Sequence, residues 1–119
     1  MSSSASILTS IKKVLGVDAE CDAFDTDILM QINATFLTLS QLGVGPEEGF
    51  SISGPEDEWT DFMEDGIVLN SVKSYIGLKV KQLFDPPQSS AVMESMKNQI
   101  AEYEFRMLTQ VSVDKRKGV

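Results

Sequence analysis

Residues 66–87, GIVLNSVKSYIGLKVKQLFDPP, contain the pattern that decides the fold. Apolar residues recur in this stretch at helical spacing, at Leu69, Val72, Ile76, Val80 and Leu83. This spacing is typical of an amphipathic helix that packs one face against a core. We expect the helix to run from about Gly66 to Phe84. It ends there because the two prolines that follow lack the amide hydrogen and clash with the preceding turn.

Outward from this helix, three other segments show apolar residues at the same spacing. They predict helices over residues 6–15, 25–42 and 89–108, and Thr60 begins a further helical turn. Gly16 and Gly43 follow the first two helices, as glycine often does at a helix C-terminus. The last helix carries a heptad-like seam at Met93, Met96, Ile100, Tyr103 and Met107. The sequence therefore predicts an all-α protein, a small four-helix bundle in one domain.

The connection over residues 43–59 is long and irregular. Its four glycines and two prolines exclude a continuous helix. The alternation in Phe50-Ser51-Ile52-Ser53 favours a short strand or hairpin. One interpretation of this segment is a solvated surface loop. The other is that Phe50, Ile52 and Trp59 bind a neighbouring subunit or partner, because four helical stripes leave little room in the core of a 119-residue chain.

The C-terminal residues 109–119 differ from the preceding segment in the spacing of their apolar residues and in their charge. Val111 and Val113 alternate with polar residues, and the basic triplet Lys115, Arg116 and Lys117 follows. We therefore divide the chain into a helical domain, 1–108, and an extended C-terminal arm, 109–119. Such an arm can add a strand to a partner protein while its basic end meets acidic groups. The alternative is a frayed terminus.

Charge is unevenly distributed along the chain, whose net charge is −8. Residues 17–66 carry thirteen acidic residues and no Lys or Arg, whereas residues 67–119 carry eight basic and five acidic residues. A protein that grips nucleic acid needs a basic surface, because contacts with phosphates supply most of its affinity. The acidic segment is instead either a solvated surface that keeps the protein soluble, or a surface that avoids DNA or meets a basic partner.

Residues for catalysis or metal binding are scarce. There is no histidine, and the single cysteine, Cys21, lies between Glu20 and Asp22, which disfavour a thiolate. The acidic residues 56–65 do not match an EF-hand, because placing Gly66 at position 6 leaves no Glu at position 12. No apolar run is long enough to cross a membrane, and the N-terminus has no secretory signal. We expect no enzymatic activity, no cofactor or metal, no membrane contact, and synthesis in a host cytoplasm.

The order and spacing of four segments resemble the head–tail connector, or adaptor, proteins of long-tailed phages. These segments are SILTSIKK at 6–13, LGVGPEEGF at 42–50, LFDPP at 83–87 and MKNQIAE at 96–102. None of them is a chemical signature by itself, and together they span nearly the whole chain. The resemblance implies a helical subunit of the virion neck that forms a homo-oligomeric ring, usually dodecameric. The ring would lie between the portal and a head-completion, stopper or tail-terminator protein.

Genomic DNA would pass through such a ring without sequence-specific binding. A strongly basic lining would hold the passing duplex, so we expect acidic residues on or near the channel wall. The candidates are Glu47, Glu48, Glu56, Asp57 and Glu58.

Two other functions remain open from the sequence. The first is a small acidic phage regulator that inhibits a host protein or mimics DNA. The second is a helix-turn-helix DNA-binding protein. The second is disfavoured, because no predicted helix carries the cluster of Arg, Lys, Asn and Gln that reads base edges.

Overall fold

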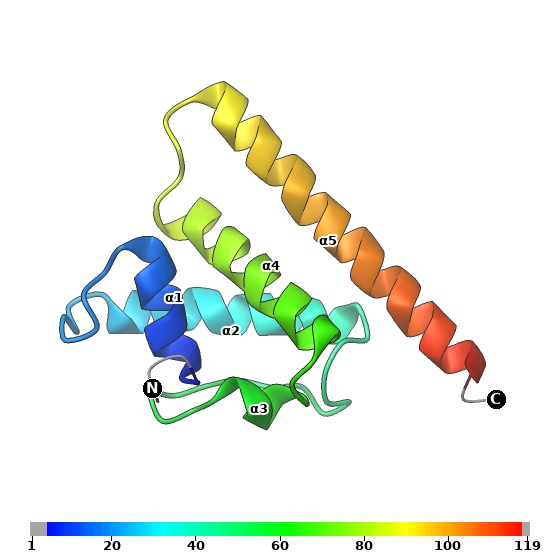
Figure 1. Ribbon diagram of the computed structural model, residues 1–119. Helices are drawn as coiled ribbons and strands as arrows, with labels where there is room; N and C mark the ends of the chain where they lie inside the picture. The colour runs from blue at the N-terminus through cyan, green and yellow to red at the C-terminus, as the bar shows by residue number, and fades with distance from the viewer. Residues whose placement is uncertain (1–4, 118–119) are drawn as a thin grey trace.

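The computed structural model describes residues 5–117, with side chains up to Val111. These residues form five helices: α1 (Ile7–Leu15), α2 (Asp25–Gln41), α3 (Trp59–Phe62), α4 (Ile67–Phe84) and α5 (Ser90–Lys117) (Figure 1). The predicted all-α bundle is confirmed, and α3 is the short turn expected at Thr60. Within the described residues no strand forms at Phe50–Ser53, and the chain makes only an isolated antiparallel bridge between Ser6 and Glu58.

Helix α4 is the centre of the bundle, because α1, α2 and α5 all pack against it (Figure 1). Three packed neighbours require more than one apolar stripe. Tyr75 and Ile76 are consecutive and point in different directions from the helix, and both are fully buried. Leu83, predicted to belong to the stripe, is 49% exposed, because it lies in the last turn of α4, where the chain leaves the core.

Helix α1 begins and ends where the sequence predicted. The Ser6 hydroxyl accepts a hydrogen bond from the Thr9 amide at 3.2 Å, which caps the N-terminus. Gly16 ends the helix in the left-handed conformation, with φ of 77°. One face of α1, including Ile7, Leu8 and Ile11, is almost completely buried against α2 and α4.

Helix α5 does not end near Leu108 but continues to Lys117. The predicted extended conformation of residues 109–117 is therefore wrong. The reason is that Val111 follows Met107 by four residues and continues the seam, so its side chain packs on the core beside Gly43. Val113 also lies in this helix, as do Lys115, Arg116 and Lys117. Residues 118 and 119 of the predicted arm lie outside the described residues.

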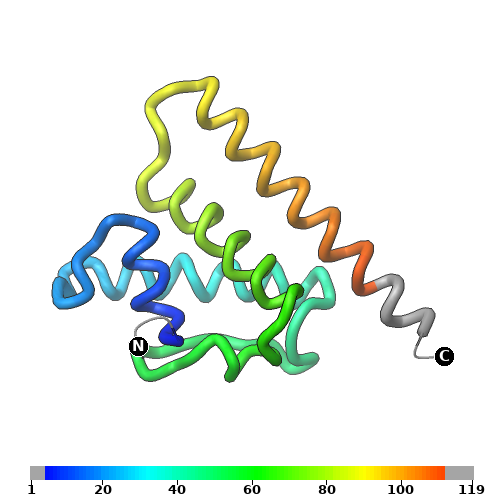
Figure 2. The backbone as a smooth tube through the Cα atoms, viewed as in Figure 1, coloured from blue at the N-terminus to red at the C-terminus, as the bar shows by residue number. Residues whose placement is uncertain are grey.

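The connection between α2 and α3 runs back along the bundle to the start of α1 (Figure 2). There the Ile7 amide donates to the Asp57 carbonyl, and the Trp59 amide donates to the Ala5 carbonyl. The side chain of Asn33 also holds Ile52: the Ile52 amide donates to Asn33 Oδ1 at 2.8 Å, and Asn33 Nδ2 donates to the Ile52 carbonyl at 3.0 Å. The segment is thus ordered by helix α2 rather than by a partner strand.

The core has room for the apolar residues of this connection. Ile52 is 5% and Trp59 2% exposed, and Phe50 is half-buried. The rings of Phe36, Phe50 and Phe62 form a cluster with centroids 4.8 to 5.2 Å apart. The premise that Phe50, Ile52 and Trp59 need a neighbouring chain for burial is therefore wrong. A single chain does not test whether they also contact a partner.

Gly45 is the position where the aromatic cluster constrains the backbone. Its φ is 93°, and a Cβ atom there would lie 2.6 Å from Phe62 Cζ. We predict that Gly45→Ala lowers the free energy of unfolding by about 2–4 kcal/mol, from left-handed backbone strain and overpacking together. Thermal or urea unfolding measures the change.

Gly49→Ala is the matched control for this substitution. Gly49 has a similar φ of 91°, but a Cβ atom there would meet nothing within 4 Å. Gly49→Ala should therefore lower the free energy of unfolding only through backbone strain, by about 1 kcal/mol. Equal losses of stability at the two glycines would show that the Phe62 contact contributes nothing.

Candidate interaction surfaces

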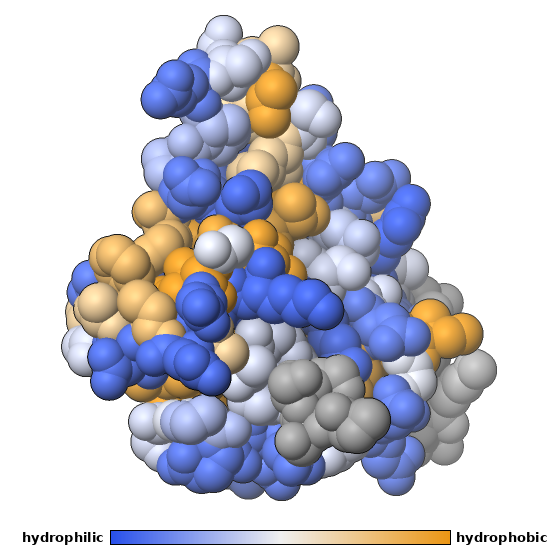
Figure 3. Space-filling view, turned by 60° about the vertical axis from the view of Figure 1, so that its left-hand side comes forward, coloured by the Kyte–Doolittle hydropathy of each residue, from blue (hydrophilic) through white to orange (hydrophobic). Residues whose placement is uncertain are grey.

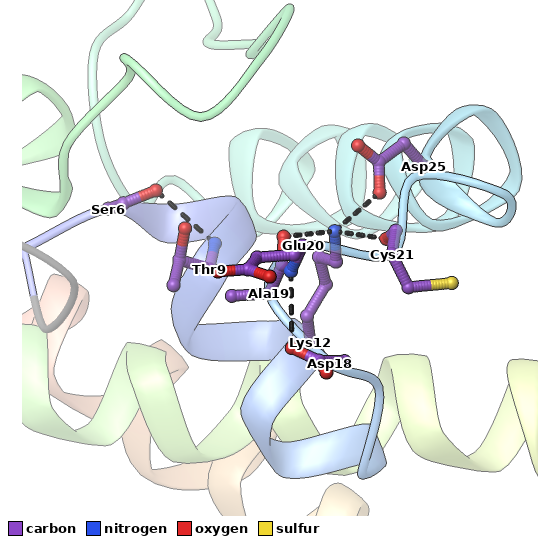
Figure 4. A network of polar contacts seen from close by, with 8 residues as sticks. All are labelled: Ser6, Thr9, Lys12, Asp18, Ala19, Glu20, Cys21 and Asp25. Carbon is purple, nitrogen blue, oxygen red and sulfur yellow. Dashed lines mark hydrogen bonds and ion pairs between the residues drawn. The ribbon is translucent and has the colours of Figure 1, made fainter.

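A buried lysine organises the acidic turn between α1 and α2 (Figure 4). Lys12 is only 3% exposed. Its ammonium group donates to the carbonyl oxygens of Ala19 at 3.1 Å and Cys21 at 2.6 Å, and lies 2.8 Å from Asp25 Oδ1. A buried ammonium needs such compensation, because its removal from water is costly. Lys12 therefore fixes the turn and the start of α2 against α1.

The remaining acidic side chains of this turn point into solvent. Asp18, Glu20 and Asp22 are exposed, whereas Asp25 is turned towards Lys12. The single cysteine, Cys21, is partly buried and contributes its backbone carbonyl rather than its thiol to the network. The exposed carboxylates of the turn thus extend from a backbone that the buried Lys12 holds in place.

The five acidic residues proposed to line a channel all lie on the α2–α3 connection. Glu47, Glu48, Glu56 and Glu58 are exposed. Asp57 is half-buried, and its Oδ2 accepts hydrogen bonds from the amides of Ser53 at 2.8 Å and Gly54 at 3.3 Å. Asp57 therefore shapes the connection, and Glu58 takes part in the capping box that begins α3. Glu47, Glu48 and Glu56 are exposed to solvent or a partner. A single chain has no channel, so their position on its wall stays a prediction.

Polar contacts fix α5 against α4 in the middle of their interface. The Tyr75 hydroxyl donates to Glu104 Oε2 at 2.7 Å, and Lys79 Nζ lies 3.9 Å from the same oxygen. Burial raises the pKa of Tyr75 well above its ordinary value, and the hydrogen bond and negative charge of Glu104 raise it further. The predicted seam surrounds this contact, with Met96, Ile100 and Met107 buried.

A pocket of about 230 Å³ lies where α5 passes the start of α4 and residues 43–45. Its lining is mainly apolar and includes Val44, Met63, Val68, Met107 and Val111. Arg106, Ser71 and Gln110 supply polar groups. Val111, predicted to contact a partner, thus packs within its own chain at the edge of this pocket. The side chains of the other predicted arm residues lie outside the described part.

Two exposed apolar helix faces were missed in the sequence analysis. The α2 outer face consists of Met30, Ala34 and Leu37, of which Met30 is 65% and Leu37 61% exposed. The α5 outer stripe consists of Ala101, Phe105 and Leu108, of which Phe105 is 70% and Leu108 47% exposed. A signal for the first was present: residues 28–46 contain no charged residue. Without charged side chains, the apolar residues on the outer side of α2 are suited to being covered by another surface.

Smaller apolar patches also interrupt the hydrophilic surface on the side of α1 and the acidic turn (Figure 3). Val14 is half exposed. Phe24 packs edge-on against Phe84, with ring centroids 5.7 Å apart, and is itself 45% exposed. In the part of the chain that the structure describes, no three acidic, Cys or His side chains are grouped so as to hold a metal ion. None of the helices described there is long and apolar enough to cross a membrane. The exposed apolar faces of α2 and α5 are surfaces suited to macromolecular contact.

Comparison with known protein families agrees with this class of protein, an assembly subunit recognised by its surfaces. The family model described as phage connector protein matches residues 7–114. Since this match covers most of the 119 residues, the chain belongs to the phage connector protein family. Comparisons with curated proteins and with solved structures gave no match. The family places the chain broadly in the connector, or neck, of a phage particle, as the sequence resemblance implied.

The Lys12 network predicts an unequal effect of two neighbouring substitutions. Lys12→Met should lower the free energy of unfolding by about 2–3 kcal/mol, because two carbonyls and a carboxylate lose a charged partner. Lys13→Met changes an exposed residue of the same helix and should change stability by less than about 0.5 kcal/mol. Chemical denaturation measures both variants. Hydrogen exchange should show faster exchange at residues 17–25 in Lys12→Met alone, and unchanged exchange there would contradict the role given to Lys12.

The Tyr75–Glu104 contact predicts how stability depends on alkaline pH. Tyr75 has a raised pKa in the folded chain, so its contribution is complete below its unfolded value of about 10 and declines as pH rises above that value. Between pH 10 and 11 the wild-type protein should lose up to about 1.4 kcal/mol more than Tyr75→Phe. Urea unfolding across this range measures the difference. Parallel pH profiles for the two proteins would contradict the assignment.

Proposed function

We propose that this chain is a structural adaptor subunit of the phage neck. In this role it forms a homo-oligomeric ring between the portal and the head-completion or stopper protein, around the channel through which DNA leaves the head. Membership of the connector family supports the general role. The observation that carries the finer proposal is the α2 outer face, which is apolar and exposed on a helix that carries no charge after Asp27. Exposed apolar faces of this kind are typical of subunits that are covered on assembly.

The acidic residues give the ring a surface compatible with passing DNA. Glu47, Glu48, Glu56 and Glu58 are exposed on one connection, and no lysine or arginine lies between residues 17 and 66. Placed at the channel wall, these carboxylates repel phosphate and leave the duplex free to slide. This arrangement needs no catalytic group and no cofactor. The same acidity would also suit an inhibitor of a host protein, but that role leaves the α2 outer face unexplained.

The C-terminal end of α5 is the proposed contact with the portal. Helix α5 has 28 residues and α4 has 18, so α5 is about 15 Å longer at 1.5 Å per residue. Its last turn carries Lys115, Arg116 and Lys117 in the sequence. A compact basic end of this kind speeds association with an acidic partner and fixes its register. Repetition around a ring then multiplies weak individual contacts through effective concentration.

Binding to purified portal protein of the same phage tests this function. We predict that the full-length chain binds portals and appears as a ring in electron micrographs. A chain that ends at Val111 keeps the core contact beside Gly43 and should therefore fold, with its helix content reduced only by the loss of residues 112–117. It should bind portals at least about tenfold more weakly, because the basic end is lost.

A full-length variant with Lys115, Arg116 and Lys117 replaced by Gln separates charge from helix length. It should bind portals with a reduced association rate and a weaker dependence on salt. If both variants bind portals as the wild type does, the C-terminal end is not the docking element. If the wild-type chain itself neither binds portals nor forms rings, the adaptor function is wrong.

A further inference from the structure

The α2 outer face and the α5 outer stripe have the same pattern. Met30, Ala34 and Leu37 are separated by four and three residues, and so are Ala101, Phe105 and Leu108. Each set is an exposed ridge with a small residue beside large ones. Two such ridges can interdigitate, because a large side chain of one helix fits over an alanine of the other.

The two faces belong to helices on different sides of α4. Helices α2 and α5 each pack their buried stripe towards α4, and their outer faces lie on the opposite sides of those helices. One molecule therefore offers two different apolar surfaces, one on each of two helices. Contacts between unlike surfaces are heterologous, and their repetition produces a ring when the rotation closes.

Charge favours the pairing of unlike faces over the pairing of like faces. Exposed acidic residues flank the α2 outer face in sequence, Asp27 before it and Glu47 and Glu48 after it. Two α2 outer faces packed together would bring these carboxylates close to one another. The α5 outer stripe instead follows the exposed Lys97 by one turn and precedes the basic residues 115–117. An α2–α5 contact thus brings acidic ends near basic ones. The exposed Glu102 beside the stripe is paired with Arg106 at 3.0 Å, so these two residues add no net charge at the centre.

We propose that the α2 outer face of one subunit packs against the α5 outer stripe of the next copy of this chain. This contact deepens the proposed function, on which it rests, by naming the surfaces that join neighbouring subunits. The occupant of each face is therefore a second copy of the chain rather than the portal or the DNA.

Disulfide cross-linking tests the contact directly. In a Cys21→Ser background, Leu37→Cys and Phe105→Cys are made singly and together, and are oxidised in concentrated solution and on purified portals. The double variant should give a ladder of covalent oligomers, and a mixture of the two single variants should give dimers. Dimers from either single variant alone would show like faces pairing and would overturn the proposal. No cross-linked product from the double variant in either condition would also overturn it.

Charge substitutions provide a second test that does not depend on cross-linking. Leu37→Glu and Phe105→Glu should each weaken self-association at least about tenfold, since a charge enters the centre of the contact. Ser95→Glu adds the same charge to an exposed position of α5 outside the stripe and should have no such effect. All three sites are exposed, so circular dichroism should show folded chains. Leu37→Glu combined with Phe105→Lys should recover association, and a failure to recover it would contradict direct contact.

The two proposals fail in different ways. If wild-type rings form on portals but the double-cysteine variant does not cross-link, the α2–α5 contact is wrong and the adaptor function stands. If the chain cross-links through Leu37→Cys and Phe105→Cys in solution but does not bind portals, the contact stands and the adaptor function is wrong.

Discussion

The structure depends on one helix being buried from three directions. Helix α4 contacts α1, α2 and α5, and these contacts are the most extensive between helices in the described chain. Val72, Tyr75 and Ile76 fall on adjoining parts of its surface and are all fully buried. Because no sheet supports the described residues, the other helices gain their positions from α4. A change in the α4 surface would therefore move several helices at once.

Polar interactions then choose one arrangement around this apolar centre. Lys12 ties the acidic turn to α1, and the Tyr75–Glu104 hydrogen bond sets the register of α5 along α4. The Asn33 side chain likewise holds the backbone of Ile52, in the α2–α3 connection, against α2. In each case one side chain satisfies backbone or side-chain groups of a distant segment. Apolar contacts account for most of the buried surface, and these few hydrogen bonds fix how the segments are positioned relative to one another.

Much of the fold could be predicted from local patterns. The glycine after Leu15 and the prolines after α4 are signals that act within a few residues, and the structure confirms them. The errors arose where distant segments meet. Val111 alternates with polar neighbours like a strand residue, but it also continues a helical seam whose partner is Gly43, far away in sequence. Ile52 and Trp59 were assigned to a partner because the size of the core cannot be judged before the helices are placed.

The candidate surfaces were harder to predict than the helices. The acidic segment and the absence of histidine led only to the expectations that the chain is not an enzyme and does not grip DNA, which stay predictions. The α2 outer face and the α5 outer stripe were missed, because apolar residues on both sides of a helix give no clear periodicity until one side is known to be buried. Family membership supports the neck role, whereas the surfaces proposed to carry it became visible only with the structure.

The Lys12 network also has a consequence for sequence divergence. Its ammonium group is held partly by the carbonyl oxygens of Ala19 and Cys21, which any residue at those positions would supply. The side chains of residues 18–22 can therefore be replaced while the bend between α1 and α2 is retained. Variation of the side chains in this turn is thus compatible with one underlying scaffold, as is usual where a rigid framework displays a variable loop.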